Sequence, residues 1–167
     1  MFRGLTGSTL KWIAMITMLI DHVAATILVR HMLSNGATKE VYTVYEVMRN
    51  IGRVAFPIYC FLLVEGFLYT KNVYRYITRM FLFVLLAELP FDMAFAGEFP
   101  YLNYQSVMLT LLIGLLTMLV CRKWEEKWPD NELLQLIGIL VCTAAGMALA
   151  YVLKTDYAHK GVLSIMA

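Results

Sequence analysis

An aspartate and a histidine stand side by side inside the first long apolar run of the chain. The run from Thr9 to Val29 is long enough to cross a bilayer, and Asp21 and His22 lie just past its middle. An ionised carboxylate at that depth costs roughly 2.5–3.5 kcal/mol, so such a residue is by default a candidate for function. A histidine can take a proton from an attacking amine and return it to a leaving group, while a carboxylate orients or charge-stabilises the ring. The pair therefore predicts acyl transfer, with His22 as general base and Asp21 as its partner.

The composition indicates that these residues lie in a membrane protein. Hydrophobic residues make up 60% of the chain and charged residues 16%, and the mean hydropathy is +0.68. We expect a single all-α transmembrane domain over residues 1–167, with about five spans and the start of a sixth at Gly161. The expected spans are Thr9–Val29, Ile51–Thr70, Ile77–Ala96, Gln105–Cys121 and Leu133–Leu153. The short final run leads us to expect that further C-terminal spans are lacking.

Basic residues in the connecting segments predict the orientation. With the N-terminus in the cytoplasm, the inner segments hold slightly more Lys and Arg than the outer ones. The segment from Gly97 to Asn103 has no basic residue, which favours an outer position. We therefore expect a cytoplasmic N-terminus.

On that topology, polar residues from several spans reach a similar depth in the outer half of the membrane. Glu88 and Asp92 share a helix face, and Pro90 between them is expected to kink the helix. The further members of this set, which we expect to support the substrate or the structure, are Arg53, Asn103, Asp156 and Tyr157. Together they predict an outer polar cavity, in which Arg53 either binds an anion or pairs with Glu88 or Asp92. Asn103 and Tyr157 are candidate donors to a developing oxyanion.

The expected cytoplasmic side carries cations that could meet the phosphates of an acyl donor. These are Lys71, Arg75, Arg79, Arg122 and Lys123. The alternative for each is the ordinary excess of positive charge on inner loops. Glu65, near the inner end of its span, is either a supporting site residue or a partner of Arg75 or Arg79.

Several classes of function are disfavoured. The three cysteines, Cys60, Cys121 and Cys142, have no metal-ligand spacing, so we expect no metal and no disulfide. Phosphate-loop, dinucleotide and hydrolase-elbow motifs are absent, and a net charge of +2 without a basic stripe argues against nucleic acid as a partner.

Five ordered motifs resemble the TraX family, named for an inner-membrane protein required for N-terminal acetylation of F-type pilin. They are the run from Leu10 to His22, Ile51 to Pro57, Val64 to Phe67 with Tyr69-Thr70, Arg79 with Ala87 to Asp92, and Asp156-Tyr157 with Gly161 to Leu163. Ala158 departs from the pattern, since glycine is expected after Asp-Tyr.

The resemblance implies a polytopic acyltransferase of the bacterial cytoplasmic membrane that uses acetyl-CoA or another acyl-CoA. It also suggests kinship with transmembrane acyltransferases such as heparan glucosaminide acetyltransferase, in which a membrane-embedded histidine is central. The expected partners are the lipid bilayer, acyl-CoA and an amine-bearing acceptor, and homo-oligomerisation is left open. A covalent acyl-histidine intermediate is the less favoured mechanism. Two other functions stay open: a proton-coupled transporter, and a non-catalytic subunit of a pilus machine.

Overall fold

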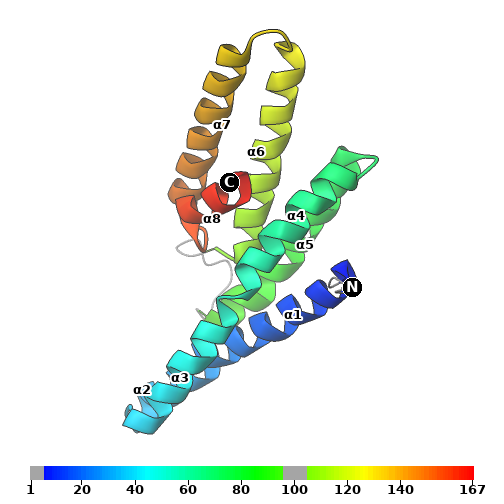
Figure 1. The fold of residues 1–167 in the computed structure, drawn as a ribbon. Coiled ribbons are helices and arrows are strands. Elements are labelled where there is room, and N and C mark those ends of the chain that lie inside the picture. The colour runs from blue at the N-terminus through cyan, green and yellow to red at the C-terminus, as the bar shows by residue number, and fades with distance from the viewer. Residues whose placement is uncertain (1–5, 96–104) are drawn as a thin grey trace, which may run out of the picture. The chain divides into compact units, whose positions relative to one another are not determined.

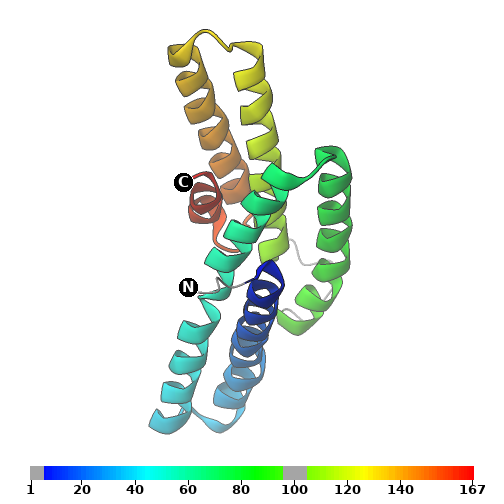
Figure 2. The same ribbon diagram turned by 45° about the vertical axis from the view of Figure 1, so that its right-hand side comes forward.

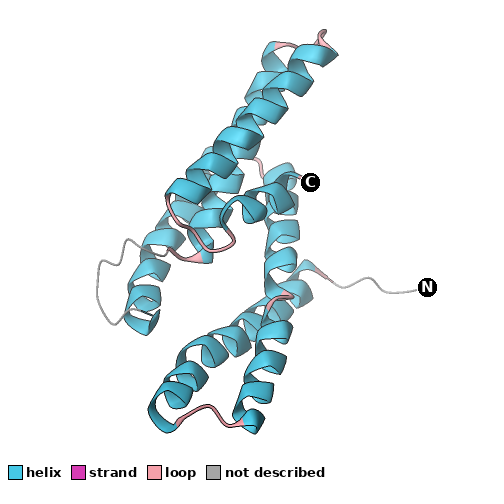
Figure 3. Ribbon diagram, turned by 90° about the vertical axis from the view of Figure 1, so that its left-hand side faces the viewer, coloured by secondary structure: helices cyan, strands magenta, loops and turns pink. Residues whose placement is uncertain are grey.

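The computed structural model describes residues 6–95 and 105–167, and these residues form helices joined by short turns (Figure 3). Within the described ranges, the sole β-type pairing is an isolated bridge between Gln105 and Thr155. The expected all-α fold is confirmed. The chain divides into two compact units, residues 1–62 and residues 63–167, and the boundary falls within helix α4 (Ala55–Tyr69).

The first unit is built on a long helical run that contains the Asp21-His22 pair. The run comprises α1 (Gly7–Val23), a π-helical segment η1 (Ala24–Leu28) and α2 (Val29–Asn35). It begins at Thr6, whose side chain accepts a hydrogen bond from the Thr9 backbone N–H at 3.2 Å. It ends at Gly36, whose positive φ of 83° leaves the helical region.

Helix α3 (Lys39–Gly52) returns alongside α1, as Figures 1 and 2 both show. The Thr38 side chain caps it by accepting a hydrogen bond from the Val41 N–H at 3.4 Å. A short turn at Arg53 and Val54 then leads into α4. Because α1 and α3 are antiparallel neighbours, residues late in α3 lie beside the middle of the first run.

The second unit contains α5 (Val73–Phe95), α6 (Val107–Lys127), α7 (Glu132–Val152) and α8 (Ala158–Met166). Helix α6 contacts α5, α7 and α8, and Figure 1 shows α6 and α7 running side by side. Glycines allow this close packing. A Cβ at Gly138 would overlap the indole of Trp124, and one at Gly114 would overlap Ile165.

Four helices are long and apolar enough to cross a membrane, judged by length and composition: Gly7–Asn35, Lys39–Tyr69, Val107–Lys127 and Glu132–Val152. The third expected span forms the helix Val73–Phe95, which is not one of these four, and Pro90 lies inside it. The expected boundaries also shift. The first run continues to Asn35, and the segment before Ile51, which we expect from the sequence to be a loop, is the helix α3.

Candidate functional site

His22 lies on the first long helical run, with its ring nitrogen held by the preceding turn. Nδ1 is 2.8 Å from the carbonyl oxygen of Met18, one turn earlier. A carbonyl can only accept a hydrogen bond, so a neutral ring in this geometry carries its proton on Nδ1 and is basic at Nε2. His22 is half-buried. The geometry thus suits His22 to proton transfer through Nε2.

The helix changes its hydrogen-bonding pattern immediately after His22. The π-helical segment begins at Ala24, and the hydroxyl of Thr26 donates to the backbone carbonyl of His22 at 2.6 Å. Single π-helical turns inside α-helices are frequent at functional sites, because the wider turn displaces backbone groups from their regular partners. Thr26 is a residue of this site that the sequence reasoning missed, since an isolated threonine in an apolar run carries no distinctive signal.

Asp21 has a cationic partner on the neighbouring helix. The guanidinium of Arg49 on α3 donates to the Asp21 carboxylate and forms an ion pair with it; the Arg49 and Asp21 side chains are 32% and 19% exposed. Gly52, one turn further along α3, contacts the same carboxylate so closely that a Cβ there would overlap it. Sequence reasoning missed Arg49 because it placed this residue in a loop. Asp21 as the partner of His22 stays a prediction.

Arg53 lies in the turn between α3 and α4 and is exposed. Its guanidinium donates a hydrogen bond to the side-chain oxygen of Asn50 at 3.1 Å. The expected pairing of Arg53 with Glu88 or Asp92 stays a prediction, because Arg53 belongs to the first unit and both acids belong to the second.

In the second unit, Glu88 is hydrogen-bonded to Ser106, the residue that precedes α6. Its carboxylate accepts hydrogen bonds from the hydroxyl of Ser106 at 2.7 Å and from the backbone N–H of Ser106 at 3.3 Å. Asp92, one turn after Glu88, is 1% exposed. The expected oxyanion donor Asn103 lies outside the described residues.

The loop between α7 and α8 is hydrogen-bonded to the N-terminal end of α6 and to Gln105, just before it. Gln105 exchanges backbone hydrogen bonds with Lys154 and Asp156, at 3.1 and 3.0 Å. The hydroxyl of Thr110 donates to the backbone carbonyl of Asp156. The loop thus holds Asp156 and Tyr157 in one defined conformation.

Two residues of this loop and the first residue of α8 have positive φ, and none of them is glycine: Lys154 at 52°, Tyr157 at 61° and Ala158 at 41°. This region is disfavoured for residues with a Cβ, and such strain clusters at functional sites. Glycine adopts it without penalty. The positive φ therefore explains why glycine suits the position of Ala158.

The cations expected to bind an acyl donor line two pockets that share Lys71. One, of about 210 Å³, is lined by Lys71, Arg75 and Arg79 together with Thr70, Asn72 and Tyr76. The other, of about 380 Å³, is lined by Lys71, Arg122 and Lys123 together with Tyr74, Glu126 and other residues. Asn72 caps α5 by accepting a hydrogen bond from the Arg75 N–H at 3.0 Å. The N-terminus of α5 adds its partial positive charge to the pocket region.

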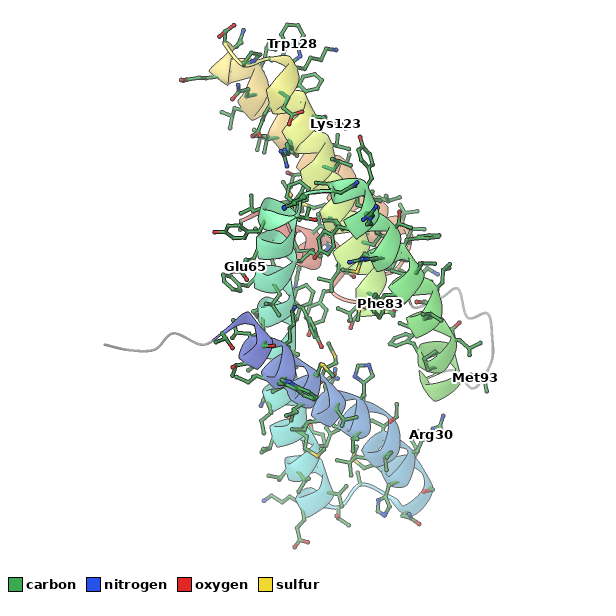
Figure 4. All side chains as sticks on the ribbon, turned by 90° about the vertical axis from the view of Figure 1, so that its right-hand side faces the viewer. Arg30, Glu65, Phe83, Met93, Lys123 and Trp128 are labelled. Carbon is green, nitrogen blue, oxygen red and sulfur yellow. The ribbon has the colours of Figure 1, made fainter. Side chains whose placement is uncertain are left out.

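Glu65 is half-buried on α4, next to Gly66 (Figure 4). A Cβ at Gly66 would lie 2.8 Å from the Tyr76 hydroxyl oxygen, so α4 and α5 approach closely here. Pairing of Glu65 with Arg75 or Arg79 stays a prediction. In the described part of the chain, no group of three or more His, Cys, Asp or Glu side chains is arranged to hold a metal ion.

Helices of this length and hydropathy, carrying a half-buried Asp-His pair, define a helical membrane protein. A family model described as "TraX protein" matches residues 6–167, and the chain belongs to this family.

A curated relative is the probable fimbrial assembly protein FimC, serogroup H1, of Dichelobacter nodosus. It is 32% identical over 118 residues, which cover 66% of this chain and 44% of the relative. The chain thus spans less than half the length of this relative. No solved structure matches the chain.

Proposed function

We propose that the protein is an acyltransferase of the bacterial cytoplasmic membrane, which moves an acetyl or other acyl group from acyl-CoA to an amine during pilus or fimbrial assembly. Membership of the TraX family and the similarity to a probable fimbrial assembly protein support the link to assembly. The observation that carries the catalytic part is the geometry of His22, whose Nδ1 lies 2.8 Å from a backbone carbonyl and leaves Nε2 as the basic nitrogen.

In the proposed reaction, the nitrogen of a neutral amine attacks the thioester carbonyl of the donor. A C–N bond forms while the amine proton passes to Nε2 of His22, which acts as general base. The tetrahedral intermediate then collapses, the C–S bond breaks, and the CoA thiolate takes the proton from His22. Tyr157 and Asn103 remain the predicted donors to the oxyanion.

The donor would bind through its phosphates at the pocket of Lys71, Arg75 and Arg79. Two arginines on one helix face offer planar forks that match phosphate oxygens. Asn72 and the N-terminus of α5 support an anion there. Acyl-CoA is thus held by residues different from those that move the proton, so binding and catalysis can be separated by mutation.

The test measures CoA release from acetyl-CoA and from longer acyl-CoAs by the purified full chain, with small amines and pilin-like peptides as acceptors. We expect His22→Ala to slow transfer by about 10²–10⁴-fold, the usual contribution of general-base catalysis. CoA binding, measured by calorimetry, is expected to persist. His31→Ala is the matched control, because His31 is an exposed histidine of α2.

Transfer at the wild-type rate by His22→Ala would contradict the role of His22. A wild-type protein that neither binds CoA nor transfers acyl groups would favour the non-catalytic assembly subunit. Proton flux in liposomes without acyl transfer would favour the transporter.

A further inference from the structure

An apolar pocket of about 430 Å³ lies beside the basic pocket of the second unit. Helix α4 contributes Val64, Phe67 and Leu68 to its lining, α6 contributes Met118, and α8 contributes Met166. This volume falls within the roughly 300–1,000 Å³ of small-molecule sites. The charged side chains in its lining are Arg122 and Glu125.

Arg122 also lines the basic pocket, so one guanidinium joins the two pockets. It lies over the ring of Phe67, 5.9 Å from the ring centroid, and its Nε donates to the Glu126 carboxylate at 3.2 Å. In the basic pocket, the ammonium of Lys123 (Figure 4) lies 5.3 Å from the centroid of the Tyr74 ring. The charged residues that line the two pockets are three cations, Lys71, Arg122 and Lys123, and two acids, Glu125 and Glu126. The lining of the two pockets therefore carries more positive than negative charge.

A ligand that fits this arrangement has a phosphate a short distance from a long alkyl chain. Acyl-CoA fits poorly, because the arm that follows its phosphates contains two amide groups, and burying them in an apolar pocket without partners is costly. A glycerophospholipid fits better, because only the glycerol backbone and one ester group separate its phosphate from each long alkyl chain. On the expected topology, the pockets also lie at the cytoplasmic interface, where anionic headgroups attract basic residues.

We propose that these two pockets together bind one anionic glycerophospholipid, with its phosphate on Arg122 and Lys123 and an acyl chain along Val64, Phe67 and Met118. The lipid site adjoins the donor pocket of Arg75 and Arg79, and Thr70, Lys71 and Asn72 line both pockets, so the lipid phosphate is placed on the two cations that line only the lipid site. It goes beyond the proposed acyl transfer and does not depend on it. The bound lipid would fill the apolar space between α4, α6 and α8.

The test titrates the delipidated full chain in detergent with fluorescent phosphatidylglycerol. We expect saturable binding, with phosphatidylcholine and phosphatidylethanolamine binding at least about tenfold more weakly. Arg122→Gln and Lys123→Gln each remove a charge-assisted hydrogen bond and are expected to weaken binding about tenfold or more. Lys127→Gln is the matched control on the same helix. Val64→Trp fills the apolar pocket and is expected to weaken binding, whereas Phe61→Trp, at an exposed position of α4, is not.

Two further arms distinguish the lipid from the acyl donor. Arg75→Gln is expected to leave lipid binding unchanged, and millimolar CoA is expected not to displace the lipid. Displacement by CoA would assign the site to the donor and overturn the proposal. Equal binding of the three lipids would overturn it as well, as would wild-type affinity in both Arg122→Gln and Lys123→Gln.

Discussion

The Asp21 carboxylate on α1 is paired with the Arg49 guanidinium on α3, 28 residues further along the chain. This contact couples the two antiparallel helices at the level of the candidate base His22. Both side chains are half-buried, and removing one charge of an ion pair in such surroundings is unfavourable. The pair therefore fixes the register of α3 against α1, and with it the position of the turn that carries Arg53.

A double-mutant cycle measures the strength of this ion pair. We expect Asp21→Asn and Arg49→Gln each to lower the stability of the protein in detergent, because each removes one member of the half-buried ion pair. The double variant is expected to be more stable than the sum of the two losses implies, with a coupling energy of about 1–3 kcal/mol. Thermal unfolding monitored by circular dichroism provides the measurement. Strict additivity would show that the two charges do not interact.

The close approach of Gly52 to Asp21 gives a second prediction. A Cβ at position 52 overlaps the Asp21 side chain, so Gly52→Ala must push α3 away from α1 or displace the carboxylate. We expect a loss of about 1–3 kcal/mol in unfolding free energy, as for overpacked cores. Gly7→Ala is the control, since a Cβ there meets nothing within 4 Å. Equal stability of the two variants would contradict the tight packing.

The sequence predicted the helical class because long apolar runs are a strong signal. It did not predict α3, whose exposed and half-buried positions mix charged residues such as Lys39 and Glu40 with valines, so its average hydropathy is that of a loop. The covered face of the helix shows in the spacing of the half-buried residues Val41, Tyr45 and Met48, which are four and three residues apart. Averaging over the whole segment hides this pattern.

The sequence singles out individual candidate residues but does not indicate which of them contact one another. A charged residue inside an apolar run is conspicuous, which is why Asp21 was found. Its partner Arg49 depends on how α3 packs, and sequence periodicity does not report packing between helices. The five cations do line two adjoining pockets, since they flank two neighbouring helix ends, and their role in binding a donor stays a prediction. The positive φ of Tyr157 had no signal in its residue type.

The hydrogen bond from Thr26 to the His22 carbonyl gives a third prediction. Thr26→Val removes the hydroxyl while keeping the branched shape, so the His22 carbonyl loses a 2.6 Å hydrogen bond within the π-helical turn. We expect a stability change of only about 1 kcal/mol but a clear fall in acyl transfer, because the orientation of the imidazole changes. Thr26→Ser restores the donor and is expected to restore activity. Full activity in Thr26→Val would show that this turn does not position the base.

The hydrogen bonds between Ser106 and the Glu88 carboxylate give a fourth prediction. Ser106 is 3% exposed, and Ser106→Ala removes the 2.7 Å hydrogen bond from its hydroxyl to the Glu88 carboxylate. Hydrogen bonds to charged groups contribute roughly 1.5–3 kcal/mol, so we expect a loss of stability in that range. Ser164→Ala is a suitable control, because the Ser164 hydroxyl bonds only to a carbonyl of its own helix at an exposed site. Similar melting temperatures for both variants would contradict a structural role for Glu88.

The orientation of the chain gives the last prediction. With a cytoplasmic N-terminus and with α5 crossing the membrane in addition to the four candidate helices, Asn35, at the end of α2, lies outside, and Asp130, in the turn between α6 and α7, lies inside. In a background with Cys60, Cys121 and Cys142 replaced by alanine, we expect Asn35→Cys to react with an impermeant maleimide on intact cells. Asp130→Cys is expected to react only after lysis. Both positions are exposed, so access to the reagent depends on membrane sidedness and not on burial. Reversed labelling would put the pockets around Lys71 on the outer side, away from cytoplasmic acyl-CoA.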